Sequence, residues 1–374
     1  EGRIFWLHGG NPLVETPSQY SWDRYVAYSD WLNSPAPYGP VWILSLWFPQ
    51  LLPQRDPAMV VLSYKSLALV FHLLTGVGVW LLAGQLAPER RRLAATIYTW
   101  NPLLLFVTAV DGHNDVVMMF FAVLALYFAV RERWLLSLPL LALSVLSKYV
   151  TLVLVPLVLW YGWRRGSWRG RAMLGLGAAL AVVVGVATLA PFWRGIDTFR
   201  ALASDERTWL YVSLPETLYF GLNDIMSRQA AMDVAQAVAL AIFLVPYGIV
   251  LWRLRGGGEA LVRACYHAML FYLVIASGIF NPWYITWVMA LAAPLADRAA
   301  LVAGAFTLIG MLAAHRGPTL LLNFQRHWGL SPGRPLMAAV QFLPVLALWL
   351  ALEWRRLYKR VQIGAKTVVL GRSG

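Results

Sequence analysis

Long apolar runs separated by short arginine clusters constrain this chain more than any other feature of its sequence. The runs over residues 59–86, 172–192 and 234–252 are long enough to cross a bilayer, which takes roughly 20 apolar residues in an α-helix. Only 13% of all residues are charged, against roughly a quarter in soluble domains. The sequence therefore predicts an all-α, polytopic transmembrane helical bundle, with about eleven membrane segments.

The distribution of charge predicts the orientation of this bundle. A net charge of +13 could indicate nucleic-acid binding, but the arginines lie in short clusters between the apolar runs, at residues 90–92, 131–133 and 253–255. Lysine and arginine concentrate in the cytoplasmic loops of membrane proteins. We therefore expect these loops in the cytoplasm of a multi-pass plasma-membrane protein, and we expect no nucleic-acid partner.

The chain divides into three regions by composition. Residues 1–58 are mixed and rich in tryptophan, and we expect an outer-face loop with an interfacial helix over residues 41–52, which are apolar but too few to cross a bilayer. Residues 59–354 form the multi-span transmembrane domain. Residues 355–374 are a basic tail, expected in the cytoplasm.

The segment from Trp134 to Trp163 has basic residues on both flanks, which a single crossing would place on opposite sides of the membrane. Two short helices, over residues 134–147 and 149–163, satisfy the charge rule if they form a hairpin whose tip is Lys148. An ammonium in this setting keeps its proton only beside an anionic partner. A substrate phosphate, Asp115 and Asp111 are all candidates for that partner.

Residues 111–115, Asp-Gly-His-Asn-Asp, lie between two apolar runs, where ionisable groups are costly and therefore indicate function. If a helix begins near Gly112, Asp111 caps it. On such a helix Asp111, Asn114 and Asp115 share one face, which could bind sugar hydroxyls, or phosphate together with a divalent cation such as Mg²⁺ or Mn²⁺. We predict Asp111 and Asp115 as catalytic residues and potential metal ligands, with His113 and Asn114 as substrate-binding residues.

Other polar and aromatic residues are less specific. The turn from Asn281 to Tyr284 fits an interfacial aromatic belt, but Trp283 and Tyr284 could also form a wall against a sugar or a lipid chain. Asp23 and Asp30 are interpreted as surface charges. The histidines are too scattered to predict a metal site. Cys265 is the single cysteine, which excludes an internal disulfide and a cysteine-based metal site.

Several stretches in combination resemble the integral-membrane glycosyltransferases of the GT-C class, specifically the bacterial mannosyltransferase-like members. The resemblance covers most of the chain. It rests on Glu1-Gly2-Arg3 with Gly10-Asn11-Pro12, the stretch from Ser34 to Trp42, Tyr98 to Pro102 followed by Gly112 to Asp115, Lys148-Tyr149, and a later aromatic motif from Asn281 to Trp287.

This resemblance implies transfer of a hexose, expected to be mannose, from a polyprenyl-phosphate carrier to a glycan, lipid or protein acceptor at the outer face of the membrane. It adds Arg3, Asn11, Tyr38 and Tyr149 to Lys148, Trp283 and Tyr284 as substrate-binding residues. In this class the main base is typically an aspartate shortly before the segment that matches Glu1 to Arg3. We therefore expect the chain to be truncated at its N-terminus and to lack that base.

The chemistry of such a transfer needs a carboxylate to deprotonate the acceptor hydroxyl and positive charge on the leaving phosphate. No second, nucleophilic carboxylate is evident, so we predict inversion at C1. Two other functions stay open: a transporter or lipid-linked-sugar flippase, and a non-catalytic membrane subunit. A transporter is expected to have pseudo-symmetric halves, and the sequence shows no clear match between its two halves.

Overall fold

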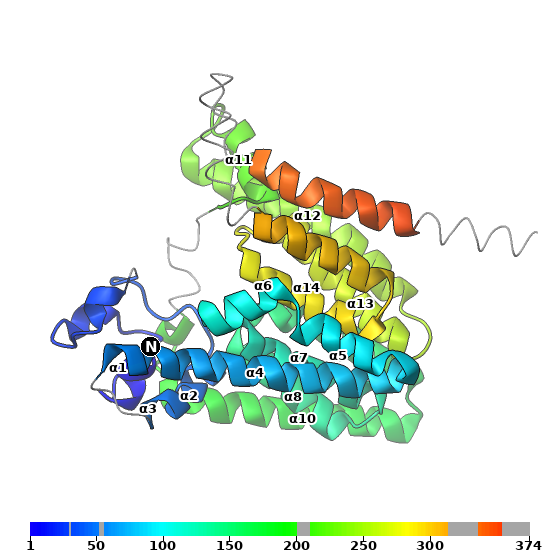
Figure 1. The fold of residues 1–374 in the computed structure, drawn as a ribbon, viewed down its shortest axis with the longest axis horizontal. Helices are drawn as coiled ribbons and strands as arrows, with labels where there is room; N and C mark the ends of the chain where they lie inside the picture. The colour runs from blue at the N-terminus through cyan, green and yellow to red at the C-terminus, as the bar shows by residue number, and fades with distance from the viewer. Residues whose placement is uncertain (30, 52–55, 200–209, 313–335, 354–374) are drawn as a thin grey trace, which may run out of the picture.

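Helices account for nearly all the regular structure of the computed structural model, which describes residues 1–29, 31–51, 56–199, 210–312 and 336–353. Within these ranges the only β structure consists of two isolated bridges. The long helices lie side by side in one bundle, and the N-terminal residues lie against one end of it (Figure 1). The prediction of an all-α, polytopic bundle is confirmed.

Five described helices are long and apolar enough to cross a membrane. They are α4 (Pro57–Leu86), α10 (Trp168–Leu189), α12 (Arg228–Arg253), α13 (Gly258–Phe271, continued to Ala276) and the helix Leu336–Glu353. A sixth span is bent by 49° where the helix ending with α5 (Arg91–Thr99) meets α6 (Pro102–Leu105) and its extension to Val110. The bend falls at Asn101-Pro102, because proline has no backbone N–H to donate to the preceding helical turn.

Shorter helices complete the bundle and the segments outside it. In the bundle these are α7 (Asp115–Val130), α8 (Trp134–Ser147), α9 (Val155–Arg165), α14 (Ile285–Ala292) and Arg298–Leu312. Outside it are α1 (Gly2–Trp6), α2 (Pro40–Ser45), α3 (Trp47–Gln50) and α11 (Leu214–Leu222). The basic tail expected at residues 355–374 lies outside the described residues.

The predicted hairpin at Lys148 is present. Helix α8 ends at Ser147, and a 3₁₀ segment, Tyr149–Leu154, leads into α9. The two arms run antiparallel, because the Ser144 hydroxyl lies 3.0 Å from that of Thr151 near the tip and Trp134 packs on Tyr161 near the base. Lys148 itself has extended backbone angles (φ −156°, ψ 119°), which is why neither arm continues through it.

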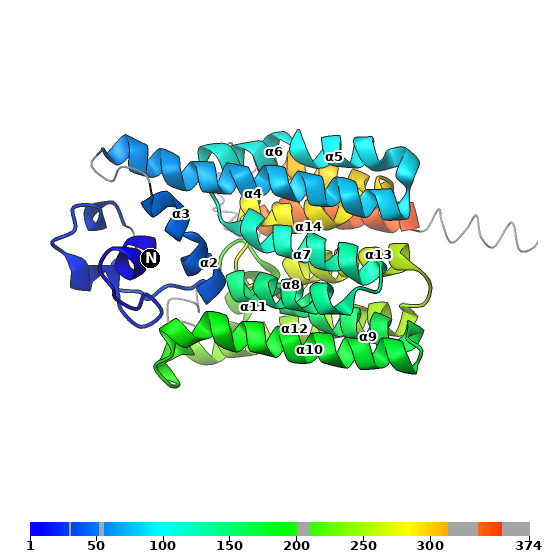
Figure 2. The same cartoon turned by 90° about the horizontal axis from the view of Figure 1, so that it is seen from below.

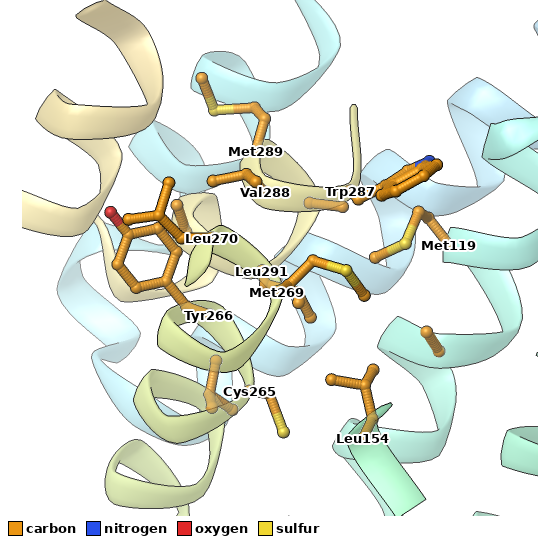
Figure 3. Packing of buried hydrophobic residues seen from close by; sticks show 14 of the residues in the cluster. Met119, Leu154, Cys265, Tyr266, Met269, Leu270, Trp287, Val288, Met289 and Leu291 are labelled. Atoms are coloured by element: carbon orange, nitrogen blue, oxygen red, sulfur yellow. The ribbon is translucent and has the colours of Figure 1, made fainter. Parts of the chain in front are cut away.

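Helix α7 lies in the centre of the bundle and is buried along most of its length. It packs against α4, α8 and α14, while α13 and α14 continue the same core (Figure 3). The core includes Met119 of α7, Leu154, Met269 and Leu291. A helix that is apolar all round is expected in such an interior position. By contrast, α10 and α12 leave most of their apolar side chains exposed, as helices facing lipid do.

The two ends of the bundle differ in character. The turns at residues 38–40, 111–115, 147–149 and 281–284 belong to one end, which we call the site end. The opposite end holds the arginine-rich turns, where Arg165 pairs with Glu132 at 3.5 Å and Arg263 pairs with Asp297 at 2.7 Å. This segregation matches the charge pattern on which the predicted orientation was based.

The N-terminal segment, residues 1–29 and 31–51, docks on the site end (Figure 2). The Asn11 amide donates to the Phe192 carbonyl at 2.7 Å, and the Gly39 N–H donates to the Ser147 carbonyl at 3.2 Å. A Cβ on Gly39 would lie 1.9 Å from the Leu146 carbonyl oxygen, so only glycine permits this approach. The single helix expected over residues 41–52 is wrong: it is two short helices, α2 and α3, separated at Leu46.

Candidate active site

Two loops meet at the site end, and each follows a π-helical turn. The turn Phe106–Val110 precedes the loop at residues 111–114, and the turn Tyr272–Ala276 precedes the loop that leads to Trp287. π-Helical turns are rare and occur frequently at functional sites. The two π-helical turns therefore indicate that the loops that follow them are candidate functional segments.

The loop at residues 111–114 is a turn and not the start of a helix. Gly112 has a φ of +79°, a conformation that favours glycine, and α7 begins only at Asp115 with Asn114 as its N-cap residue. The expectation that Asp111, Asn114 and Asp115 share one helical face is therefore wrong. Instead, Asp115 sits at the start of α7, where its charge is favoured by the helix dipole.

Asp115 and Lys148 form a buried ion pair. The Lys148 Nζ lies 2.7 Å from Asp115 Oδ1, and the two side chains are 15% and 2% exposed. The indole N–H of Trp287 donates to the same oxygen at 2.5 Å. Of the partners that the sequence left open for Lys148, the structure shows Asp115.

Three aromatic rings surround the Lys148 ammonium. It lies 4.6 Å from the ring centroid of Tyr284, 5.1 Å from that of Trp287 and 5.4 Å from that of Tyr38. Tyr284 and Trp287 are themselves stacked at 4.2 Å. A cation within about 6 Å of a ring face is attracted to it. The rings and Asp115 thus hold the ammonium charged in a setting where water is scarce.

The second carboxylate oxygen of Asp115, Oδ2, is buried and has no hydrogen-bond partner among the described residues. Buried polar atoms in native proteins are nearly always paired, so an orphan calls for an explanation. Three N–H donors are available on a lysine ammonium, and only one is used on Asp115. The pair therefore retains hydrogen-bonding capacity on both partners.

His113 stacks on Trp283 with ring centroids 3.8 Å apart, which joins the two loops. Burial lowers the pKa of His113 below its ordinary value of 6.5, although the nearby carboxylates of Asp115 and Asp111 oppose the shift. The neutral imidazole is therefore the form that the fold stabilises.

We expect this shift to make the protein sensitive to mild acid. Because the folded state disfavours protonated His113, its contribution to stability is present above pH 6.5 and is lost as the pH falls below that value. His113→Gln should reduce the decrease in thermal midpoint between pH 7.5 and pH 5.5 in detergent. An unchanged decrease in that variant would assign the acid sensitivity to other groups.

A cavity of about 430 Å³ lies between the N-terminal segment and the loop at residues 111–114. This volume is within the range of small-molecule sites, roughly 300–1,000 Å³. Lys148 and Asp115 are not among its lining residues, but Tyr38 contributes to both places. The lining residues are Glu1, Gly2, Arg3, Tyr25, Tyr38, Trp42, Leu46, Val60, Tyr64, Gly112, His113 and Asn114.

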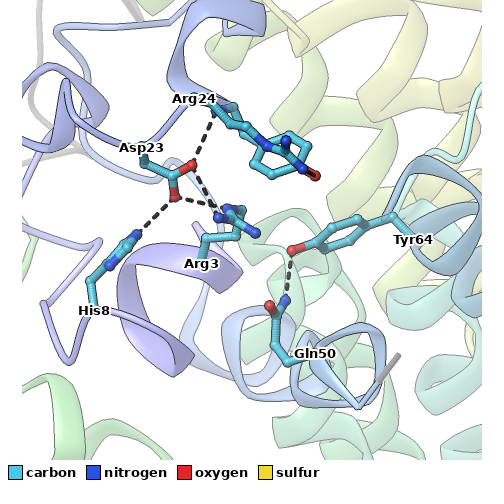
Figure 4. Close-up of polar contacts among 7 residues, drawn as sticks. Arg3, His8, Asp23, Arg24, Gln50 and Tyr64 are labelled. Carbon is cyan, nitrogen blue, oxygen red and sulfur yellow. Dashed lines mark hydrogen bonds and ion pairs between the residues drawn. The ribbon is translucent and has the colours of Figure 1, made fainter. Parts of the chain in front are cut away.

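Arg3 enters this cavity from α1 and is paired with Asp23 (Figure 4). Its Nε and Nη2 donate to the two carboxylate oxygens at 2.8 and 3.0 Å, and His8 Nε2 lies 2.8 Å from Oδ2. Burial alone would raise the pKa of Asp23, but the hydrogen bonds from Arg3, His8 and the Tyr25 backbone lower it to about 2. The interpretation of Asp23 as a surface charge is wrong, since its side chain is 4% exposed; Asp30 lies outside the described residues.

Two further polar contacts support the wall of the cavity. The Trp42 indole N–H donates to Glu1 Oε2 at 2.8 Å, and the Gln50 amide donates to the Tyr64 hydroxyl at 2.6 Å (Figure 4). Neither contact is predicted by a sequence pattern. The partners in the first pair are 41 residues apart, and no local pattern joins them.

Some predicted site residues do not line the cavity. Asn11 is buried and bonds to the Phe192 carbonyl, so it ties the N-terminal segment to α10. Tyr149 opens the 3₁₀ segment after Lys148 and is also absent from the lining. Asp111 is on the exposed side of the turn, with its carboxylate 4.0 Å from His113 Nε2.

The geometry does not favour the suggested cation site. Asp115 already accepts from an ammonium and an indole, and Asp111 is the more exposed of the two carboxylates. Among the described residues, no group of three or more histidine, cysteine, aspartate or glutamate side chains could hold a metal ion.

Two family models match this chain. Residues 2–164 match the model described as alpha-(1->6)-mannopyranosyltransferase, N-terminal domain, and residues 216–319 match the model described as MptB C-terminal domain. The first match includes Arg3, Tyr38, His113, Asp115 and Lys148. The second includes Trp283 and Tyr284 of the loop and Trp287 of α14.

Two curated relatives carry the same activity name. Alpha-(1->6)-mannopyranosyltransferase A of Mycobacterium tuberculosis is 25% identical over 331 residues, which is 80% of this chain and 61% of the relative. Its namesake in Corynebacterium glutamicum is 21% identical over 327 residues, 79% of this chain and 65% of the relative. The chain thus spans less than two thirds of the length of either relative. These similarities support a mannosyltransferase.

Proposed function

We propose that this protein transfers a mannosyl group from a polyprenyl-phosphate carrier to a glycan acceptor at the extracytoplasmic face of the plasma membrane, with inversion at C1. The observation that supports it best is the buried pair of Lys148 and Asp115, walled by three aromatic rings, beside a sugar-sized cavity. The mannosyltransferase names of the matched model and of the relatives support mannose as the transferred sugar.

In this proposal Lys148 stabilises the leaving phosphate. When the acceptor hydroxyl attacks C1, the bond from C1 to the phosphate oxygen breaks and its electron pair goes to the phosphate. Positive charge already in place where negative charge develops is among the largest contributions to catalysis. In this proposal Asp115 does not line the cavity that would hold the acceptor; through its Oδ1 it holds Lys148 in position.

The acceptor proton needs a destination. Of the described residues, the Glu1 carboxylate and the neutral imidazole of His113 line the cavity and can accept it. The α-(1→6) linkage in the names of the relatives is proposed for the product of this chain as well. Because an α product formed with inversion requires a β-linked mannose, the donor is proposed to be β-linked to phosphate.

The test supplies purified protein in proteoliposomes with β-linked polyprenyl-phosphate [³H]mannose and α-1,6-mannobiose. Label is expected to appear in a water-soluble trisaccharide from which α-mannosidase releases labelled mannose. Empty liposomes serve as the control.

Two results would contradict the proposal. A β-linked trisaccharide would show that configuration is retained. Labelled lipid that changes leaflet without forming a new glycosidic bond would instead identify a flippase, the main alternative function.

A further inference from the structure

The cavity at the site end contains the mix of groups that a neutral sugar needs. Flat aromatic surfaces come from Tyr25, Tyr38 and Trp42, and hydrogen-bonding groups come from Arg3 and Asn114. Binding sites for small molecules typically combine apolar and aromatic walls with a few well-placed polar groups. The phosphate-binding candidate, Lys148, lies outside the lining, on the other side of Tyr38. Donor phosphate and cavity ligand would therefore occupy neighbouring places with one shared ring.

Arg3 is the one guanidinium in this lining, and its orientation is fixed from two directions. Asp23 receives two of its N–H groups in a forked arrangement, at 2.8 and 3.0 Å. The ring of Tyr25 lies under the guanidinium carbon at 4.2 Å. A forked carboxylate contact and a stacked ring together set both the direction and the plane of an arginine. The loss of side-chain entropy is thus incurred on folding and not on ligand binding.

Asp23 is itself held in place. His8 Nε2 lies 2.8 Å from its Oδ2, and the Tyr25 backbone N–H donates to its Oδ1 at 3.0 Å. The ring of His8 is stacked on Tyr20 at 5.3 Å, which fixes it in turn. None of these residues except Arg3 and Tyr25 lines the cavity. Asp23 and His8 lie outside the cavity lining and hold the Arg3 side chain in place (Figure 4).

We infer that the cavity binds the acceptor sugar, and that Asp23 is a positioning residue that holds the Arg3 guanidinium against it. The inference rests on the proposed glycosyl transfer and extends it by dividing the site in two. Lys148 and its rings take the donor phosphate, and Arg3, Tyr25 and Trp42 take a neutral hexose of the acceptor glycan. Asp23 acts through Arg3 and does not touch the sugar.

Steady-state kinetics in which donor and acceptor are varied separately test this division. Asp23→Asn keeps the size of the side chain but removes the charge that orients Arg3. We expect the KM for α-1,6-mannobiose to rise about 10- to 100-fold, the value of a hydrogen bond to a charged group. The KM for the lipid donor and kcat at saturating acceptor should stay within about twofold. Asp56→Asn, the same change at an exposed helix cap of the same end, is the matched control.

A double-mutant cycle separates positioning from general structural support. Arg3→Lys keeps the charge but loses the fork, and it should raise the acceptor KM as much as Asp23→Asn does. If Asp23 acts through Arg3, the double variant should be no worse than either single variant by more than about threefold. If the fold-increases in acceptor KM of the two single variants multiply in the double variant, the positioning role of Asp23 is overturned. Tyr25→Leu removes the ring under Arg3, together with the contacts of that ring and its hydroxyl to Arg24, and leaves the ion pair of Arg3 and Asp23 in place. If Asp23→Asn unfolds, this variant provides the comparison instead.

Two outcomes would overturn the assignment of the cavity. One is a rise in donor KM with acceptor KM unchanged, which would make the cavity a donor site. The other is unchanged kinetics in Arg3→Lys. Calorimetric titration with α-1,6-mannobiose distinguishes failure of the proposed function from failure of this inference. If the wild type transfers no sugar but binds mannobiose, and Arg3→Lys loses that binding, the cavity assignment stands without the transferase.

Discussion

Lys148→Met is expected to lower the rate of mannosyl transfer by about 100- to 1,000-fold, the usual effect of removing one group that stabilises developing negative charge. Methionine retains the length and the apolar stem, so the three surrounding rings keep a packing partner. The ammonium is the part that the leaving phosphate needs. Initial rates of label transfer at saturating donor and acceptor measure this effect.

The matched control breaks a buried ion pair at the other end of the bundle. Arg263 lies 2.7 Å from Asp297, and the arginine side chain is 13% exposed, close to the 15% of Lys148. Arg263→Met should therefore lose similar stability and keep its turnover per folded molecule. Near wild-type transfer by Lys148→Met would end the assignment of Lys148 to the leaving phosphate.

Asp115→Asn is expected to cost about 3–5 kcal/mol of folding free energy, because it leaves the Lys148 ammonium buried without its anion. Asparagine fits the same space and can still accept from the Trp287 indole. The single variant should also lose activity, since Lys148 is no longer held in place. Denaturation midpoints in detergent, with activity measured per folded molecule, give both quantities.

The double variant Asp115→Asn/Lys148→Met distinguishes stability from catalysis. Removing both charges eliminates the unpaired ion, so the double variant should recover most of the lost stability and none of the activity. If the double variant were as unstable as the sum of the single variants, the two side chains would not be energetically coupled. The pair would then contribute by packing alone.

The hairpin at Lys148 could be predicted from the sequence because it follows from charge and length. Basic residues on both flanks of the segment from Trp134 to Trp163 require an even number of crossings, and the segment is too short for two full spans. The structure has the first arm at Trp134–Ser147, as predicted. Its second arm begins as a 3₁₀ segment, a local detail that charge and length do not determine.

The contacts of Asp115 were only partly predictable. Its pairing with Lys148 was one of three open alternatives. The sequence shows the charges that each element carries, but it does not show how deep the element lies in the bundle or how it is rotated about its axis. Trp287, which donates to the same carboxylate, is 172 residues away. Its role depends on how α14 packs against α7, and a belt of interfacial aromatic residues would show the same sequence pattern.

Asp23 and Asn11 show why polar residues near turns are hard to interpret from sequence. Asp23 was assigned to the surface because an isolated charge in a mixed segment is usually solvated. Burial beside Arg3 depends on how residues 1–29 fold back on themselves, which no periodic pattern encodes. Asn11 was assigned to substrate, but its amide instead closes the junction with α10.

The docked N-terminal segment has a thermodynamic consequence for the cavity. Glu1, Arg3, Tyr25, Tyr38 and Trp42 form one wall, and the loop at residues 111–114 contributes to the other, so neither part alone encloses the space. A ligand that needs both walls binds only the docked arrangement, and docking and binding become a single linked equilibrium. Ligand at 100 times its dissociation constant would favour docking by about 2.7 kcal/mol. A ligand that binds in the cavity therefore also stabilises the docked position of the N-terminal segment.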